Sequence, residues 1–265
     1  MRKILVLFLT VFVLGISVLN AQDDEKGATL FAGVDVGLYH FSNNLRSDVD
    51  FIRNQVNSYH FDYDGNSNYS SKVNSYFFSS AFSIKASYFT LKNYAELGVG
   101  LRFSKYLTYI GDESGYQYFY FKASESGLTT NYYRIYSINQ DFTNVSIPLE
   151  IKLYPYQASL VRLYFKFSSE FIFTINESRE VKFVDSDMDK FKNEVWSKFS
   201  DPDPFKIMLM PSLGLRFCKD NKYVAISGEI GMPFFVQENQ FSLVEVDNGF
   251  NFQLNVSMPI NAVKK

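Results

Sequence analysis

The sequence contains few of the residues that most often carry chemistry. Its 265 residues include one cysteine, Cys218, two histidines, His40 and His60, and a single tryptophan. One cysteine excludes an intramolecular disulfide and a cysteine-based zinc site, and two imidazoles leave little for other metal centres. The formal net charge of −2 provides no basic field that would gather nucleic acid. We therefore expect no cofactor, no metal and no nucleic-acid partner.

The one long apolar run lies at the N-terminus. A basic pair precedes the apolar residues 4–19, and the run ends near a small residue, Ala21, with acidic residues after it. This is the order of a secretory signal, and the run is shorter than the roughly 20 residues that a membrane-spanning helix needs. We expect residues 1–21 to be a cleaved signal peptide and residues 22–265 to form one exported domain. The expected cleavage point carries no cysteine, which excludes a lipoprotein.

Aromatic residues, by contrast, are abundant, with 28 Phe and 19 Tyr in the chain. In the segment 145–175, apolar residues alternate with polar ones most clearly. From Val145 to Leu153 every second residue is apolar, while Glu150 and Lys152 stand on the other parity. A period of two is that of a strand with one apolar and one polar face. The short break at Tyr156-Gln157-Ala158 makes this segment a β-hairpin.

Alternation of this kind recurs in eight segments. They cover residues 30–41, 78–88, 95–104, 145–154, 161–175, 207–217, 224–234 and 250–260. The connections after the second, fourth and sixth segments are tight turns, and those after the other segments are long. An even number of strands with turns at one end and loops at the other is typical of an outer-membrane barrel. We therefore predict an all-β fold for residues 22–265: an eight-stranded antiparallel up-and-down transmembrane β-barrel with short periplasmic turns and long extracellular loops. Its expected location is the outer membrane of a Gram-negative-type cell, in contact with outer-membrane lipid.

The small residues indicate which face of this barrel points inward. A soluble eight-stranded cup would turn its apolar side inward. In this sequence Gly98, Gly100, Gly214 and Gly231 share the parity of the charged residues, and a crowded interior needs small residues. Charges on the lipid side would cost about 2–4 kcal/mol each near the midplane. We expect the charges to form an ion-pair network that plugs the lumen, and the alternative is a water-filled lumen with separate charges. The predicted network comprises Asp35, Lys85, Glu96, Arg102, Glu150, Lys152, Arg162, Lys166, Glu170, Arg216 and Glu229.

Four prolines fall inside the predicted strands, where a proline removes a hydrogen-bond donor from the ladder. Pro148, Pro233 and Pro259 can stand near strand ends or at bulges. Pro211 falls in the middle of a strand on the lipid-facing parity, which predicts a bulge at that position.

The second long loop contains two further segments with strand propensity. Residues 116–121 and 131–138 are rich in aromatic and β-branched residues, and residues 124–127 favour a turn between them. We expect a hairpin that continues beyond the membrane, with a composition typical of binding hot spots. The alternative is that its rings pair with one another and fold over the barrel mouth. One face of the hairpin is expected to show the tyrosines of the first arm, and the return arm is expected to add its own tyrosines to that face. Together with Arg134, the candidate binding residues are Tyr116, Tyr118, Tyr120, Tyr132, Tyr133, Arg134 and Tyr136.

Two other loops contain apolar residues at helical spacing. The first set is Leu45, Val49, Ile52 and Val56, and the second runs from Phe191 to Phe199 with Trp196 alongside. Both predict short helices that pack on the barrel mouth or form a docking surface for a partner.

His60 and the acids that follow it are the only candidates for catalysis. A histidine in a loop can act as a general base, but the sequence provides no nucleophile at a fixed spacing. Residues 62–68 offer oxygen ligands, although Gly65 stands too early for an EF-hand calcium loop. A solvated loop rich in turn residues accounts for both observations.

Several patterns together resemble a known family. They are the end of the signal at residues 19–22, the strand with Ile147-Pro148-Leu149-Glu150-Ile151-Lys152, the glycine-rich strand 97–101 and the terminal strand. The mature chain resembles the eight-stranded outer-membrane β-barrel family that includes the PorT-like proteins. Some PorT-like proteins are associated with type IX secretion and gliding machinery, and the resemblance implies such a role as one possibility here. One departure is that the chain runs past Ile260 instead of ending on an aromatic residue.

These observations lead to three alternatives for function. The first is a non-enzymatic barrel that serves as scaffold, adhesin or envelope-complex component and contacts other envelope proteins through its extracellular loops. The second is a small-solute pore. The third is an outer-membrane hydrolase or acyltransferase built on His60.

Overall fold

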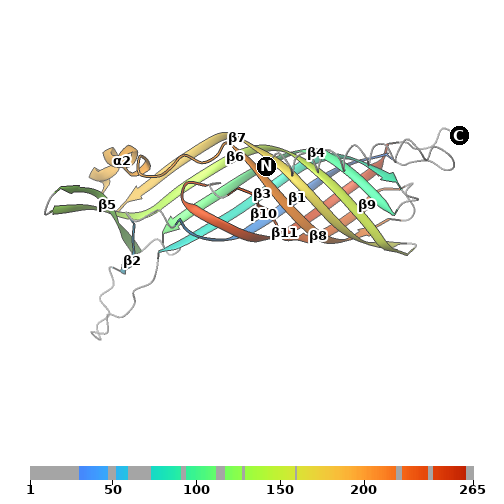
Figure 1. Cartoon of the computed structure of the whole chain (residues 1–265), viewed down its shortest axis with the longest axis horizontal. Helices are drawn as coiled ribbons and strands as arrows, with labels where there is room; N and C mark the ends of the chain where they lie inside the picture. Colours follow the sequence, from blue (N-terminus) through green and yellow to red (C-terminus); the bar gives the residue numbers. More distant parts are fainter. Residues whose placement is uncertain are drawn as a thin grey trace, which may run out of the picture.

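The computed structural model shows an elongated barrel with a strand extension at one end (Figure 1). It describes residues 30–46, 52–58, 73–90, 94–111, 117–126, 129–158, 160–218, 223–237 and 241–260. The expected signal peptide, His60 and the 62–68 segment therefore lie outside the described residues.

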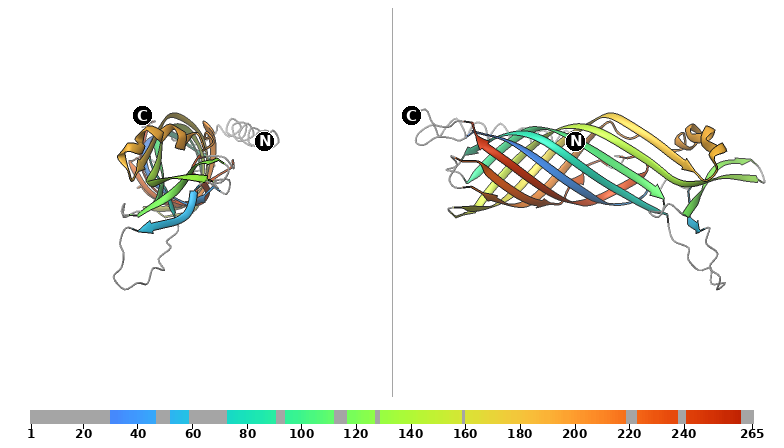
Figure 2. Two further views of the ribbon diagram at one scale, coloured as in Figure 1. Left: turned by 90° about the vertical axis from the view of Figure 1, so that its left-hand side faces the viewer. Right: turned by 180° about the vertical axis from the view of Figure 1, so that it is seen from behind.

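The barrel wall is a closed ring of eight antiparallel strands, as predicted. Each strand pairs with the next in the chain, and the last pairs with the first, Val256 lying opposite Val34. Figure 2 shows this ring from its loop end. Its members are β1 (Leu30–Leu45), β3 (Asn74–Thr90), β4 (Ala95–Gly111), β6 (Thr129–Gln157), β7 (Val161–Phe183), β8 (Phe205–Phe217), β9 (Ala225–Gly231) and β11 (Val244–Pro259).

The two faces of the ring differ in polarity as the alternation predicts. Outward side chains such as Val36 and Ile84 are more than half exposed, at 53% and 54%, and they form an apolar belt around the wall. Inward side chains such as Arg102 and Glu150 are buried, at 2% and 4%. An apolar outer face around a polar interior is the arrangement of a transmembrane barrel and the opposite of a soluble cup.

The outward face changes character toward the loop end. On β6 the exposed Ile151 and Ile147 are followed on the same parity by Thr143, Asp141 and Asn139. The inward face changes in the reverse direction, and its charged residues give way to a hydrophobic core near that end. The apolar belt therefore ends near residue 145 of β6, and the wall beyond it is polar outside and apolar inside.

Pro211 does not produce the predicted bulge. Its register with Phe167 on β7 is unbroken, and β10 (Phe234–Phe235) continues the register of β9 against β8. The interruption lies in the neighbouring strand, where β9 ends at Gly231 and Met232 donates its N–H to the Pro211 carbonyl at 3.0 Å. The missing donor of Pro211 therefore faces the point where the ladder between β8 and β9 is interrupted.

Beyond the belt, the strands form an extension that is longer than predicted. β6 begins at Thr129 and β7 runs on to Phe183, and β5 (Gln117–Ser126) pairs with the free length of β6. β2 (Ile52–Ser58) pairs in turn with β5, so the helical spacing of Ile52 and Val56 gave a wrong prediction. Residues four apart share a face in a regular strand as well as in a helix, which is why the spacing of Ile52 and Val56 was ambiguous.

The second predicted helical segment does form. It comprises the 3-10 helix η2 (Ser186–Phe191) and α2 (Lys192–Trp196), which lie at the rim of the loop end (Figure 2). Within the described ranges, no helix has the length and apolar character of a membrane span.

Candidate functional site

The lumen holds a continuous chain of buried ion pairs. Lys85 Nζ lies 2.7 Å from Asp35 Oδ2 and 2.5 Å from Glu150 Oε1, so one ammonium joins two strands to β3. Arg102 extends the chain, with Nη1 2.6 Å from Glu170 Oε2 and Nη2 3.4 Å from Asp35 Oδ2. Each cation lies between carboxylates from different strands, and the network therefore ties opposite sides of the wall together.

Lys166 continues this series of ion pairs toward the turn end of the lumen. Its Nζ lies 3.6 Å from Glu150 Oε1 and forms a closer pair with Glu229 on β9. Tyr164 donates its hydroxyl to Glu229 Oε2 at 2.9 Å. Seven of the predicted network residues are thus joined in one cluster, namely Asp35, Lys85, Arg102, Glu150, Lys166, Glu170 and Glu229.

A second, smaller cluster lies at the turn end of the lumen. Glu96 forms ion pairs with two cations, with Lys152 Nζ at 3.7 Å and Arg216 Nη1 at 3.4 Å. The Arg216 guanidinium also lies over the rings of Phe31 and Phe89, at 4.7 and 4.9 Å from their centroids. Cation–π contacts of this kind partly replace the hydration that a buried guanidinium loses.

Two further buried cations lie on β7 and β8. Arg162 is buried on β7, directly opposite Arg216 on β8. Lys206 was not predicted, because the predicted strand began one residue later. It is fully buried, donates to the Asp203 carbonyl at 2.6 Å, and lies 5.2 Å from the Phe142 ring centroid. The strand parity of residue 206 was the signal that could have found it.

Both ends of the lumen are closed by aromatic side chains. At the turn end Phe31, Phe89, Tyr154 and Tyr164 form a small core, each no more than 2% exposed. At the loop end the buried Phe241 packs against Phe77, Tyr106, Phe142 and Phe235 as part of a larger core. The described residues therefore fill the lumen from end to end.

The extension presents an aromatic face on its outer side. The rings of Tyr118 and Tyr120 lie 5.6 Å apart, and that of Tyr132 lies 6.0 Å from Tyr120. Arg134 lies over the Tyr118 ring at 5.9 Å, and its Nη2 donates to both carboxylate oxygens of Asp185, at 2.7 and 3.0 Å. We call the set Tyr118, Tyr120, Tyr132, Arg134 and Tyr136 the tyrosine face.

Tyr133 lies on the opposite side of the sheet from the predicted position. Its ring stacks on Phe191 at 5.1 Å, and its hydroxyl donates to Glu194 Oε2 at 2.9 Å. Neighbouring residues of a strand point to opposite faces, so Tyr132 and Tyr133 do not share one. Burial and the hydrogen bond to Glu194 raise the pKa of Tyr133 to about 12. Tyr116, also predicted for this face, lies outside the part of the chain that the structure describes.

α2 forms the backing of the tyrosine face. Val195 and Trp196 are buried in the loop-end core, and Phe199 packs at 6.2 Å from the Phe121 ring. Arg179 lies over the Trp196 ring at 5.2 Å. Hydrogen bonds to Glu177 and Asp201 raise the pKa of the Arg179 guanidinium above its usual value. The extension is therefore a packed structure that shares the loop-end core of the barrel.

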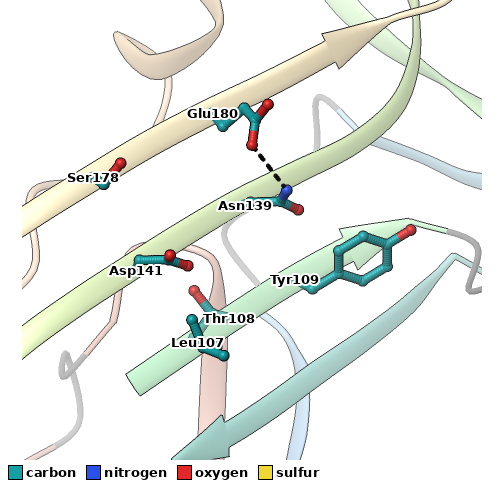
Figure 3. Close-up of a pocket in the computed structure, with 7 residues that line it drawn as sticks. All are labelled: Leu107, Thr108, Tyr109, Asn139, Asp141, Ser178 and Glu180. Carbon is teal, nitrogen blue, oxygen red and sulfur yellow. Dashed lines mark hydrogen bonds between the residues drawn. The ribbon is translucent and has the colours of Figure 1, made fainter. Parts of the chain in front are cut away.

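Two adjoining hollows mark the outer wall near the edge of the apolar belt. The hollow farther from the belt measures about 270 Å³. It is lined by Leu107, Thr108, Tyr109, Asn139, Asp141, Ser178 and Glu180 (Figure 3). The other measures about 390 Å³, and Phe82, Phe103, Ser80, Thr143 and Lys105 are among its lining.

These features define a closed eight-stranded transmembrane β-barrel with a filled lumen and a structured extension at its loop end. A scan against protein-family models and a search of the curated proteins each found no match.

Among solved structures, the chain is similar to the outer membrane protein OprG from Pseudomonas aeruginosa. The two are 10% identical with a TM-score of 0.43, over 87% of this chain and 96% of that one. The outer membrane protease OmpT from Escherichia coli is 10% identical with a TM-score of 0.35, over 89% of this chain and 99% of that one. The translocator domain of the autotransporter NalP from Neisseria meningitidis is 5% identical with a TM-score of 0.32, over 97% of both chains. The description of this chain as a transmembrane barrel rests on its strand closure and on the polarity of its two faces.

Proposed function

We propose that this chain is a non-enzymatic outer-membrane barrel that presents a binding platform at the cell surface, as an adhesin, a scaffold or a component of an envelope complex. The observation that carries this proposal is the tyrosine face. Its residues stand on a sheet that is backed by α2, so their rings are held in place before any partner arrives. Rigid tyrosines give large contact area at little entropic cost, and Tyr with Arg is the composition favoured at interface hot spots.

The filled lumen favours the function of a binding platform and argues against that of a pore. An eight-stranded barrel has an interior only just wide enough for its side chains, and here ion pairs and two aromatic cores occupy it. We expect no steady single-channel current from the intact protein in planar bilayers. A reproducible conductance step from heat-modifiable, folded protein would favour the pore.

The kind of partner follows from where the tyrosine face lies. It stands beyond the apolar belt, so its partner is a protein at the outer surface of the envelope. Together with the resemblance to the PorT-like proteins, this leads us to propose an envelope complex related to secretion or gliding as the setting.

The test compares tyrosines of the tyrosine face with a tyrosine at the opposite end of the barrel. Tyr120→Ser with Tyr132→Ser removes the middle of the tyrosine face, and Tyr223→Ser removes a ring that is 57% exposed at the turn end. We expect the double variant to lose envelope proteins that co-purify with wild type from a gentle detergent extract, and Tyr223→Ser to retain them. Both variants should still migrate differently with and without boiling on a denaturing gel, as a folded barrel does.

A deletion of residues 115–131 provides the stronger form of the same test. If the heat-modifiable deletion variant retains the same proteins as wild type, the hairpin is only a cover for the barrel mouth. The proposal then fails.

A further inference from the structure

The turn end of the lumen carries more positive than negative charge. Its charged side chains in the described part of the chain are Lys152, Arg162, Arg216 and Glu96, all of them buried. Glu96 is shared between two cations, with Lys152 Nζ at 3.7 Å and Arg216 Nη1 at 3.4 Å. Buried charge that is not neutralised is costly. An additional anion at this end of the lumen would therefore be bound favourably.

Arg216 has two donor nitrogens that this pairing does not use. Its side chain is fully buried, and it reaches Glu96 through Nη1. Its Nε and Nη2 atoms have no hydrogen-bond partner among the described residues. These two nitrogens form one edge of the guanidinium, and their parallel N–H bonds make the fork that binds two oxygens of an oxyanion. The Cys218 thiol lies near the guanidinium, but a thiol is only a weak acceptor.

Aromatic rings hold the Arg216 fork in place. The Cζ atom of Arg216 lies 4.7 Å from the ring centroid of Phe31 and 4.9 Å from that of Phe89. Rings that cover the face of a guanidinium leave the N–H groups at its edge free to donate. A donor group that is ordered before its ligand arrives loses little entropy on binding. The fork is therefore preorganised for an anion.

The strands on both sides of β8 add polar groups beside Arg216. Arg162 on β7 and Ser227 on β9 both stand directly opposite it in the strand register. The Ser227 hydroxyl is buried and has no hydrogen-bond partner within the described ranges. Arg162 is the first inward residue of β7, and it retains 9% exposure at the turn-end rim. Three adjacent strands thus supply a fork, a hydroxyl and a second cation.

We propose that the turn end of the lumen binds one tetrahedral oxyanion of the phosphate class. Two of its oxygens accept from Nε and Nη2 of Arg216, and a third accepts from the Ser227 hydroxyl. The long side chain of Arg162 at the rim moves outward to admit the ion and then supplies the second positive charge. With the turns on the periplasmic side, the ion enters from the periplasm.

The number of donors favours free phosphate or a phosphate monoester over other anions. A carboxylate has two oxygens, so it would fill the fork and leave the Ser227 hydroxyl unused. The diester phosphate of a lipid headgroup also has only two free oxygens, and the barrel wall separates it from the lumen. A tetrahedral ion with three or more free oxygens can satisfy the fork and the hydroxyl together.

Titration calorimetry of the intact barrel in detergent tests the proposal, with inorganic phosphate as the probe at constant ionic strength. We expect one phosphate to bind per barrel, and sulfate but not acetate to compete with it. Arg216→Lys retains a cation beside Glu96 but removes the fork, so it should weaken phosphate binding by about tenfold or more. Ser227→Ala should weaken it by about fivefold. Lys105→Gln, which removes an exposed cation on the outer wall, should leave the affinity unchanged.

Thermal unfolding provides a second readout that needs no variant. An anion that binds only the folded barrel stabilises it by mass action. Saturating phosphate should therefore raise the temperature at which the wild-type protein loses its folded gel mobility. Acetate at the same ionic strength should not raise it.

Three results would overturn the proposal. Phosphate binding that appears only in Asp220→Asn would show that this carboxylate, which lies outside the described residues, already fills the fork in wild type. Equal phosphate affinity of wild type and heat-modifiable Arg216→Lys would place the ion elsewhere. Equal competition by sulfate and acetate, or no phosphate binding at all, would show that the fork does not select a tetrahedral ion. The proposal is independent of the tyrosine face, which lies at the opposite end of the barrel.

Discussion

The membrane part and the loop-end part of this wall are built from the same strands with opposite polarity. On β4, Arg102 points inward and Leu101 outward within the belt, whereas farther along the strand Tyr106 and Ile110 point inward and Lys105 outward. β6 repeats this change, from Glu150 inside the belt to Phe142 beyond it. One strand therefore carries two patterns, and the change from one to the other marks the edge of the lipid.

The medium around the wall, lipid or water, and not strand geometry, decides which parity of the strand residues is apolar. Within the belt the outer parity meets hydrocarbon, so polar groups gather inside and must satisfy one another. Beyond the belt the outer parity meets water, so the inner parity becomes an ordinary hydrophobic core that includes Phe77 and Trp196. The filled lumen and the packed extension are two consequences of one rule.

The largest effect is expected from removing a ring in the loop-end core. Phe77 is fully buried, with its centroid 4.6 Å from those of both Phe41 and Phe241. We expect Phe77→Ala to destabilise the barrel by about 4 kcal/mol, because it removes a buried ring and leaves a cavity. Urea unfolding in detergent, followed by the gel-mobility difference between folded and unfolded protein, measures this loss. A loss below about 1 kcal/mol would mean that the loop-end core is not packed as an ordinary protein interior.

A charge deletion in the lumen tests the other half of the comparison. Arg102→Leu leaves Glu170 and Asp35 without one of their cations. We expect a destabilisation of about 3 kcal/mol in the same urea experiment, because unpaired buried charge is costly. Arg102→Lys retains the charge and should lose less. Equal stability of wild type and Arg102→Leu would indicate a hydrated lumen with separate charges.

A matched pair of leucines tests where the belt ends. Leu101 and Leu107 are both outward on β4 and similarly exposed, at 42% and 36%. We expect Leu101→Arg to lower the free energy of unfolding by about 3 kcal/mol and Leu107→Arg to lower it by about 1 kcal/mol or less. The reason is that the free-energy cost of a lipid-facing arginine falls steeply from the midplane of the membrane to its interface. Unfolding from lipid vesicles measures both. Similar costs at the two positions would contradict an edge between them.

The smallest effect concerns the attachment of α2 at high pH. The pKa of Tyr133 is about 12 in the folded protein, above its usual value near 10. The neutral hydroxyl therefore contributes fully to the stability of the folded protein below about pH 10, and this contribution is lost as the pH rises through 12. Trp196 on α2 is the single tryptophan of the chain, so its fluorescence reports the change. The transition should be weaker in Tyr133→Phe, and an identical transition in both proteins would exclude Tyr133 as its cause.

The fold could be predicted from the sequence because a strict period of two persists through the membrane part of each strand. That period puts Arg102 and Glu150 on one face of the wall, and the glycines of the same parity indicate that this face points inward. The even strand number allows the antiparallel closing pairing of β1 with β11. The extension could not be predicted as well. Register shifts between Thr143 and Asn144 and between Ile135 and Ser137 change the pairing of β6, and no sequence signal marks them.

The errors in the candidate sites also arise where the sequence carries no clear signal of strand face or register. Tyr132 and Tyr133 were assigned to one face because both are tyrosines, whereas adjacent strand positions diverge. Lys206 was missed because the change of polarity near the belt edge hides the parity of the first residues of β8. Ion-pair partners depend on which strands lie across the lumen from one another, and that information lies in the closed ring.

Cysteine accessibility along β6 tests the change of polarity most directly. In a Cys218→Ser background, single cysteines replace Ile151, Ile147, Thr143 and Asn139 on the outward parity, and Phe142 on the inward one. We expect a water-soluble thiol reagent to label positions 139 and 143 in intact membranes. Positions 147, 151 and 142 should be labelled only after unfolding in urea, because lipid covers the first two and the loop-end core covers the third. Equal labelling of positions 151 and 139 in intact membranes would contradict the account.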